Sequence, residues 1–356
     1  MKIGLFGLPN SGKTTIFNAL TQSDAEVTAY AKAKAAPNIA VITVADERVD
    51  RLAEFYSPKK ITYPTIEIVD FAGFSEGSAK KGGFSGDQLT AFKSLDAFAL
   101  VVRNFRDDLT GDPTPLKDLE TIETEFILAD LIAVESRLEK IRWSCKRGKK
   151  TAELEAEERV LKKIEIQLND TRPIRELAFD GSEKKIISGF QYLSKKPSLV
   201  ILNSSESAFG KNSGLLGEIS EKWRVIEFAG TFEMELSKLS DAEEAMLFMK
   251  DMKISDSARD RLTQCSYETL GYISFLTVGA DEVRAWTIQQ GATAVDAAGS
   301  IHSDLARGFI RAECFSYKDF IECGSEKAVK DQGRFRLEGK EYTVNDGDIL
   351  SIRFSV

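Results

Sequence analysis

Short apolar runs alternate with helical stretches over the first 115 residues and again between about residues 197 and 277. The apolar runs that predict strands are Met1–Phe6, Thr65–Val69, Phe98–Val102, Ser198–Leu202 and Arg224–Phe228. A helical pattern follows the first of them at Thr14–Leu20. Strands separated by helices are typical of a mostly parallel sheet. The two segments are therefore predicted to form one α/β domain, residues 1–115 and 197–277.

Residues 116–196, between these segments, have a helical pattern instead. From Leu116 to about Trp143 the chain contains no Gly or Pro, and apolar side chains recur at alternating spacings of three and four. Thr151–Asn169 carries a similar apolar seam. Two such seams are typical of antiparallel helices packed as a coiled-coil hairpin, so an inserted helical domain is predicted.

The expected tip of this hairpin is basic. Five cations occur within the nine residues from Arg142 to Lys150. Two interpretations stay open at this point. A charge run is most often a solvated end, and it can also contact RNA or a partner protein.

The C-terminal residues 278–356 return to short strands. The runs that predict them are Arg284–Ile288, Phe309–Cys314, Arg334–Leu337 and Ile349–Phe354. Turn signals at Glu338–Lys340 and Asn345–Asp348 separate the last of these runs. This segment is predicted to form a small, β-rich third domain.

Composition narrows the function class. The chain has 356 residues, 42% hydrophobic and 29% charged, which is ordinary for a globular protein. No stretch approaches the roughly 20 apolar residues that span a bilayer. The net charge of −8 does not favour general or sequence-specific DNA binding, and a single histidine argues against histidine-based metal sites. Four cysteines without CxxC spacing, and no room for a signal peptide before the first strand, lead us to expect a cytoplasmic protein.

Residues Gly7–Thr14 match the phosphate-binding pattern G-x-x-x-x-G-K-[ST] in full, between a predicted strand and a predicted helix. Glycines let the backbone turn its N–H groups toward phosphate oxygens, and the helix N-terminus adds partial positive charge. Lys13 is predicted to reach the β- and γ-phosphates, and the Thr14 hydroxyl to coordinate Mg²⁺. The other loop residues predicted to contact the nucleotide are Asn10, Ser11, Gly12 and Thr15.

A second motif, Asp70-Phe-Ala-Gly73, follows an apolar strand. Asp70 stands at the strand end, where its carboxylate can hold the Mg²⁺ shell. Gly73 leaves space for a backbone N–H to meet the γ-phosphate. Loss of that phosphate would release the following segment, Phe74–Gln88, which is how nucleotide switches work.

A third motif predicts which base is bound. GTPases of this architecture place N-K-x-D after a strand, and its Asp accepts hydrogen bonds from guanine. Here the strand is followed by Asn203-Ser204-Ser205-Glu206. The Lys is missing, and the longer Glu206 carboxylate should disturb the two-bond contact with guanine. The pattern therefore argues against the guanine contact that GTPases of this architecture make.

These motifs together resemble the YchF/Obg-like ATPase family. The resemblance rests on Gly7-Leu-Pro-Asn-Ser-Gly-Lys-Thr-Thr, Asp70-Phe-Ala-Gly, Val102-Arg-Asn-Phe105 and Asn203-Ser-Ser-Glu206. Asp118–Asp130 resembles the start of the family's helical insertion, and Gly308-Phe-Ile-Arg-Ala-Glu and Leu337-Glu-Gly-Lys-Glu-Tyr resemble its TGS domain. The resemblance covers almost the whole chain in the same order.

The resemblance implies a P-loop NTPase domain, a coiled-coil insertion at residues 116–196 and a β-grasp-like TGS domain at 278–356. It implies that Asn203 faces the adenine, that Phe105 flanks it, and that Ser204 and Glu206 belong to the nucleotide site. It also implies association with the ribosome or ribosomal RNA. Phe74 stands where many GTPases carry the glutamine that orients water, so slow basal turnover is expected.

One segment departs from the family pattern. The first switch region of the family usually reads F-P-F-C-T-I-E-P-N, and here Tyr30–Asn38 keeps only the final Pro-Asn. Lys34 stands in place of the threonine. Either Lys32 or Lys34 meets the phosphates as a cation, or the loop is solvated. Asn10 either helps to hold K⁺ beside the phosphates, as in some related proteins, or is a structural loop residue.

The sequence therefore predicts an ATP-binding, slowly ATP-hydrolysing switch protein, in which Lys13, the Gly73 main chain and Mg²⁺ stabilise the transferring phosphoryl group. Turnover without a partner is expected on the order of 10⁻⁴–10⁻² per second. Two alternatives remain: a GTPase of the same fold, and a ribosome-binding adaptor with weak or lost hydrolysis. The pattern leaves the oligomeric state open.

Overall fold

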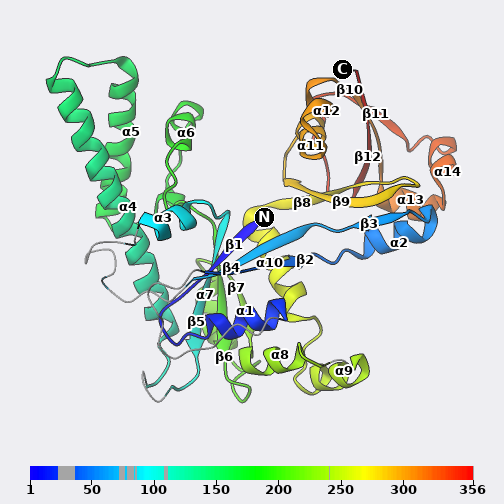
Figure 1. Cartoon of the computed structure of the whole chain (residues 1–356), viewed down its shortest axis with the longest axis horizontal. Helices are drawn as coiled ribbons and strands as arrows, with labels where there is room; N and C mark the ends of the chain where they lie inside the picture. The colour runs from blue at the N-terminus through cyan, green and yellow to red at the C-terminus, as the bar shows by residue number, and fades with distance from the viewer. Residues whose placement is uncertain are drawn as a thin grey trace. The chain divides into compact units, whose positions relative to one another are not determined.

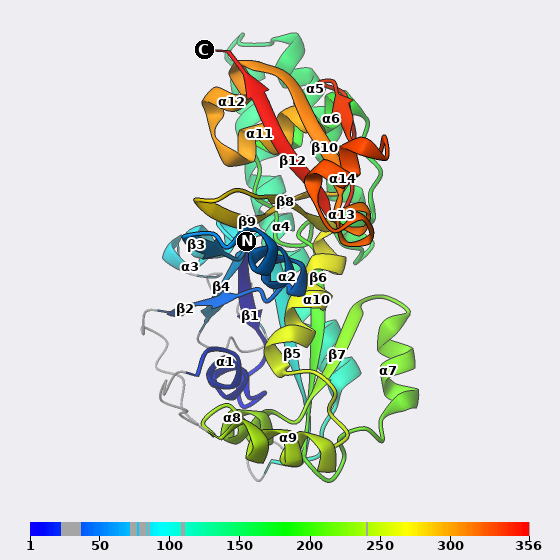
Figure 2. The same cartoon turned by 90° about the vertical axis from the view of Figure 1, so that its right-hand side faces the viewer.

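The computed structural model describes residues 1–22, 37–71, 77, 84, 86–107, 111–239 and 241–355 (Figures 1 and 2). The chain divides into two compact units, and neither is continuous in sequence. The first comprises Met1–Ala40 and Glu67–Arg259, and the second Val41–Ile66 and Asp260–Val356. No helix within the described ranges is long and apolar enough to cross a bilayer.

The first sheet has the strand order β2-β4-β1-β5-β6-β7. Its strands are β1 (Lys2–Phe6), β2 (Asn38–Thr43), β4 (Thr65–Asp70), β5 (Ala97–Asn104), β6 (Ser198–Ser204) and β7 (Arg224–Phe228). The pairs β4–β1, β1–β5, β5–β6 and β6–β7 are parallel. All five strands predicted from the apolar runs of this region are present. Because the carboxyl ends of parallel strands lie at one edge, the loops after β1, β4, β5 and β6 are brought together there.

Helices complete the first unit. They are α1 (Lys13–Thr21), α3 (Gly86–Lys93), α4 (Pro115–Lys146), α5 (Ala152–Asn169), α6 (Gly181–Ser188), α7 (Ser213–Ser220), α8 (Gly230–Leu236) and α9 (Ala242–Asp251), with a 3₁₀ turn at Ile174–Glu176. Every residue of β6 is buried, as expected for a strand inside a covered parallel sheet. Phenylalanine rings fill one side of the core, with Phe6 packed edge-on against Phe92 and Phe126.

The predicted coiled-coil hairpin is present as α4 and α5, which run side by side in Figure 1. Its seam is apolar and buried, and it includes Val134, Leu138, Ile141, Leu161 and Ile164. Beside the seam, Arg137 donates two hydrogen bonds to the Glu157 carboxylate, at 2.6 and 2.8 Å. Since the two residues come from different helices, this pair fixes the register of the hairpin.

The second unit is built on a mixed sheet of order β11-β10-β12-β8-β9-β3. Its strands are β3 (Lys60–Thr62), β8 (Tyr272–Thr277), β9 (Glu282–Gln289), β10 (Phe309–Ser316), β11 (Arg336–Glu338) and β12 (Asp348–Phe354). Its helices are α2 (Glu47–Tyr56), α10 (Ala258–Leu270), α11 (Ala294–Ile301), α12 (Ser303–Arg307), α13 (Tyr317–Cys323) and α14 (Glu326–Asp331). The four strands predicted for this region correspond to β9 to β12.

The second unit differs from the predicted domain boundaries in two places. Residues 41–66 contribute α2 and β3 to it, although the sequence placed them in the nucleotide-binding part. Val49 and Leu52 of α2 are fully buried in the same core as Leu276 and Val283. Strand β8, placed before the predicted boundary at residue 278, pairs antiparallel with β9. Both differences arise because pairing with a distant strand decides where a short element belongs. The division into three domains otherwise stays a prediction.

Candidate nucleotide-binding site

The loop between β1 and α1 depends on its glycines. Gly12 has a φ of +86°, in the left-handed region, and the neighbouring Asn10 has a φ of 61°. A Cβ atom on Gly12 would lie 2.2 Å from Nδ2 of Asn203. A Cβ atom on Gly7 would lie 2.4 Å from the Val101 carbonyl oxygen. Gly7 is thus required by the close approach of the Val101 backbone, and Gly12 by its left-handed φ and by the packed Asn203 side chain.

The side chain of Lys13 is folded over this loop and is 7% exposed. Its ammonium donates hydrogen bonds to the carbonyl oxygens of Gly7, at 3.0 Å, and Leu8, at 2.8 Å. Burial lowers the pKa of Lys13 to about 8, although the nearby Asp70 carboxylate opposes the shift. The loop therefore holds a buried donor whose charged form gains strongly from an anionic ligand.

Binding of a triphosphate should depend on pH through Lys13. With its pKa near 8 in the free protein, the lysine is charged below that pH and neutral above it. Phosphate oxygens stabilise the charged form, so binding above pH 8 requires uptake of a proton. We expect ATP affinity to be flat up to about pH 7.5 and then to weaken by at most about tenfold per pH unit.

Calorimetry at pH 7.0 and 9.5 tests this dependence. Repeating the pH 9.5 titration in buffers of different ionisation enthalpy measures the proton taken up. The terminal phosphate of ATP ionises near pH 6, so it does not titrate in this range. Equal affinities at the two pH values would show that Lys13 is charged throughout.

Thr14 and Asp70 form the second part of the site. The Thr14 hydroxyl donates to Oδ2 of Asp70 at 2.9 Å, and the Asn38 amide donates to the same oxygen at 3.4 Å. Oδ1 of Asp70 is buried and has no hydrogen-bond partner among the described residues. Burial raises the pKa of Asp70, against the Thr14 bond and the charge of Lys13. A buried carboxylate with an unpartnered oxygen beside a hydroxyl is a donor set that suits Mg²⁺.

Asn203, at the end of β6, braces the phosphate loop. Its Nδ2 donates to the Ser11 carbonyl oxygen at 3.0 Å, and its Oδ1 accepts from the Gly230 backbone N–H at 3.1 Å. The amide is 4% exposed. These bonds join the loop to β6 and to the start of α8. Each atom of the amide keeps capacity for one further bond, and its contact with adenine stays a prediction.

The base loop, residues 203–212, is held by a carboxylate that the sequence did not single out. Oε1 of Glu227, on β7, accepts from the Ser204 hydroxyl and from Nδ2 of Asn212, both at 2.5 Å. Its Oε2 accepts from the Gly210 N–H at 3.1 Å. The register of β6 and β7 places Glu227 opposite Leu202, beside this loop. The available signal in the sequence was a carboxylate that follows Val225 and Ile226 within a predicted parallel strand.

Replacing Glu227 with Gln is expected to weaken ATP binding by about three- to tenfold, since a partly buried hydrogen bond contributes about 1 kcal/mol and its loss loosens the base loop. The Ser204 hydroxyl, the Asn212 amide and the Gly210 N–H all donate to Glu227, so the N–H₂ group of a glutamine side chain at this position would face a donor. Affinity for inorganic tripolyphosphate, which has no base, should not change. Calorimetry with the two ligands separates the effects. Equal losses for both would place the defect in the phosphate loop instead.

The other predicted base-site residues lie in different surroundings. Glu206 is exposed, and Phe105 is half-buried. The buried Arg103 donates to the carbonyl oxygens of Phe105, Gly111 and Asp112, at 3.0, 2.6 and 3.2 Å, with its guanidinium 6.0 Å from the Phe105 ring. Arg103 therefore fixes the position of Phe105. This role was not visible in the sequence, because it depends on backbone carbonyls.

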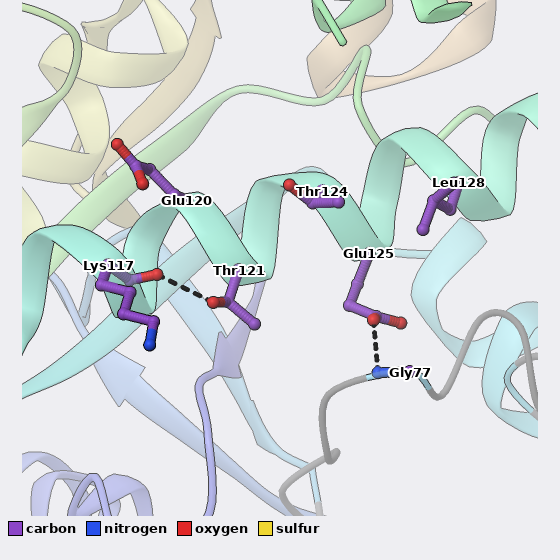
Figure 3. Close-up of a pocket in the computed structure, with 7 residues that line it drawn as sticks. All are labelled: Gly77, Lys117, Glu120, Thr121, Thr124, Glu125 and Leu128. Carbon is purple, nitrogen blue, oxygen red and sulfur yellow. Dashed lines mark hydrogen bonds between the residues drawn. The ribbon is translucent and has the colours of Figure 1, made fainter.

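The predicted switch segments are only partly visible. Gly73, Phe74, Lys32 and Lys34 lie outside the described residues. Of the segment after Gly73, the Gly77 N–H donates to the buried Glu125 carboxylate of α4 at 2.6 Å (Figure 3). An open pocket of about 330 Å³ lies at this contact. Its lining residues are Gly77, Lys117, Glu120, Thr121, Thr124, Glu125 and Leu128. Helix α4 thus contacts the segment that follows the second motif.

Comparisons with known proteins cover the whole chain. The family model MMR_HSR1, described as a 50S ribosome-binding GTPase, matches residues 2–137, and YchF-GTPase_C, described as a protein of unknown function, matches residues 272–355. The ribosome-binding ATPase YchF of Bacillus subtilis is 37% identical over 367 residues, 99% of this chain and 99% of that protein. Its Haemophilus influenzae counterpart is 38% identical over 363 residues, 100% and 99% of the two chains. The structure of the Schizosaccharomyces pombe YchF GTPase has a TM-score of 0.80 and 32% identity, and the match covers 99% of this chain and 97% of that one.

Proposed function

The chain belongs to the YchF family of P-loop nucleotide hydrolases, and on that premise we propose that it binds ATP with Mg²⁺ at Gly7–Thr14 and hydrolyses it slowly. The family resemblance predicted from the motifs is confirmed. The observation that carries the proposal is the pairing of two features at one edge of the sheet. The buried Lys13 ammonium lies on loop carbonyls, and beside it stands the Thr14–Asp70 pair.

The residues of this site stabilise the negative charge of the triphosphate and hold it in position. Lys13 exchanges its carbonyl partners for phosphate oxygens and stabilises the charge that develops on the transferring group. When bound, Mg²⁺ would supply further charge neutralisation on the phosphates, and Thr14 and Asp70 would hold it. Many GTPases have a glutamine at the position of Phe74, and that glutamine orients the attacking water. A phenylalanine side chain cannot form this hydrogen bond. Slow unassisted turnover follows from this arrangement.

We propose ATP over GTP as the preferred substrate. Support comes from the base loop, in which Glu206 replaces the Asp that binds guanine and the Lys of the N-K-x-D pattern is missing. The Glu227 carboxylate holds this loop in place by three hydrogen bonds. Titrating ATP and GTP separately in the presence of Mg²⁺ tests the preference. Tighter binding of GTP would reject it.

We further propose that the protein associates with ribosomes in the cytoplasm. The curated relatives are named ribosome-binding ATPases, and the similarity to them spans the full chain. Potassium dependence belongs to the same proposal, because Asn10 stands where some related proteins use an asparagine to help hold K⁺ beside the phosphates.

Phosphate release with and without ribosomes, in potassium and in sodium buffers, tests hydrolysis and its activation together. We expect slow release that ribosomes accelerate. If ATP binds and no phosphate is released under either condition, the chain is a ribosome-binding adaptor, and the hydrolysis proposal is wrong. If the wild-type protein does not sediment with ribosomes, the association is wrong.

A further inference from the structure

The hairpin tip, residues 140–152, concentrates positive charge in an acidic protein. It contains six cations and no acidic residue, whereas the whole chain has a net charge of −8. All six side chains are exposed: Lys140, Arg142, Lys146, Arg147, Lys149 and Lys150. Because the Debye length is about 8 Å at physiological salt, a ligand at this end responds to the tip and not to the net charge.

The cations at the tip are not neutralised by the protein. Among the described residues, Lys150 alone of the six forms an ion pair, with Glu155 at 2.7 Å. In contrast, Arg137, which precedes the tip on α4, is engaged by two hydrogen bonds to the Glu157 carboxylate. Charges further along the hairpin therefore serve its own stability, and those at the tip remain available.

The backbone of the tip is ordered by helix caps at both ends of the turn. At the end of α4, the N–H groups of Arg147, Gly148 and Lys149 bond carbonyls of the last helical turn. Gly148 takes a φ of +78°, as in common C-terminal caps. At the start of α5, the Thr151 hydroxyl accepts from the Leu154 N–H at 3.3 Å. The cations therefore project from a defined turn.

An exposed aromatic ring completes the surface. Trp143 is 61% exposed, and the Lys146 ammonium lies 5.5 Å from the centre of its ring. Tryptophan on a solvated helix end buries little in the folded chain. A basic surface beside an exposed indole ring is the combination that binds single-stranded nucleic acid, through phosphate contacts and base stacking.

We propose that the hairpin tip binds RNA, with Arg147 and Lys149 on the phosphates and Trp143 stacked on a base. The inference rests on the proposed ribosome association, and it adds that RNA is the ligand of the hairpin tip. RNA is favoured over an acidic protein because the exposed indole offers a stacking face in addition to charge, and every base has a face that can stack.

The first test measures binding of a labelled single-stranded RNA to the full chain. Each phosphate contact on a single strand contributes about 0.7 to the slope of log K against log salt, or about fourfold in affinity at 0.15 M relative to 1 M. The double substitution Arg147→Gln/Lys149→Gln should therefore weaken binding by about 15-fold and reduce the slope by about 1.4. Trp143→Ala should weaken binding about fivefold or more with the salt slope unchanged.

The control is Lys184→Gln/Lys185→Gln, which makes the same charge change on two exposed lysines of α6. It should bind RNA as the wild type does. Equal losses in both double variants would overturn the proposal, since net charge alone would then explain the effect.

Sedimentation with ribosomes separates this inference from the proposed function. If the wild type sediments and the tip variant does so equally well, the tip inference is wrong and the association stands. If the tip variant loses ribosome binding and keeps its RNA affinity, the partner of the tip is a ribosomal protein, which also overturns the inference. If the wild type binds RNA through the tip and fails to sediment, only the association is wrong.

Discussion

Replacing Lys13 with alanine is expected to weaken ATP binding by about ten- to a hundredfold, because a hydrogen bond to a charged group contributes about 1.5–3 kcal/mol. Hydrolysis should fall below detection, because a single positioned donor contributes about 3–4 kcal/mol to the transition state in a site of this kind. The Lys13 ammonium is buried, and among the described residues its hydrogen-bond acceptors are the carbonyls of Gly7 and Leu8. These acceptors are weaker than phosphate oxygens, so the cation is poised to exchange them for a triphosphate.

Folding should tolerate the same substitution. Removing a desolvated charge offsets the loss of two hydrogen bonds, so we expect a change in stability of no more than about 1 kcal/mol. Calorimetry for binding, phosphate release for hydrolysis and denaturant unfolding for stability provide the three measurements. Lys184→Ala, at an exposed position of α6, is the matched control. Unchanged ATP binding by Lys13→Ala would place the nucleotide elsewhere and contradict the site.

Replacing Gly12 with alanine is expected to have the second largest effect, because it disturbs both the loop and its brace. A non-glycine residue in the left-handed region costs about 1–2 kcal/mol. The added Cβ would also lie 2.2 Å from Nδ2 of Asn203, whose amide must then move away from Ser11 and Gly230. With one buried hydrogen bond lost, at about 1–3 kcal/mol, we expect a total destabilisation of about 2–5 kcal/mol. ATP affinity should fall by more than about tenfold.

Three further variants separate strain from collision: Gly148→Ala, Asn203→Gly and the double variant Gly12→Ala/Asn203→Gly. Gly148 also has a positive φ, and a Cβ atom there meets nothing within 4 Å, so Gly148→Ala measures the strain alone. Adding Asn203→Gly to Gly12→Ala removes the collision, and the double variant should be less destabilised than the sum of the two single variants. Denaturant unfolding measures all four proteins. Strict additivity would show that Asn203 and Gly12 do not interact.

The sequence was sufficient for the parts of the site that are local. The phosphate loop lies between a strand and a helix as its motif requires, and Thr14 and Asp70 meet because β1 and β4 are parallel neighbours. The hairpin of α4 and α5 followed from apolar spacing. In each case a short stretch of sequence carries the whole signal, either as a motif or as a period.

Features that depend on contact between distant segments could not be predicted. Glu227 holds the base loop through Ser204 and Asn212 only because β6 and β7 pair in one register. Arg103 fixes Phe105 through backbone carbonyls, which leave no trace in the residue types. Glu125 looked like an ordinary polar position of α4, yet it is buried against Gly77. The partners of Glu227 and Glu125 lie in other elements, and those of Arg103 are carbonyls of the loop that follows its own strand, so residue types along the chain encode none of these contacts.

Residues 41–66 belong to the second unit, although most of that unit lies at the C-terminal end of the chain, and this has a consequence for synthesis of the protein. Thr62 of β3 pairs with Arg284 of β9, about 220 residues later in the chain. At translation rates of about 5–20 residues per second, strand β3 emerges roughly 10–45 seconds before its partner exists. During that interval α2 and β3 are tethered to a nucleotide-binding sheet that is still being assembled, with the apolar side chains of Val49 and Leu52 uncovered. Nascent chains should therefore depend on a holding chaperone until the last strands leave the exit tunnel, and a C-terminal fragment beginning at residue 260 should be poorly soluble for the same reason.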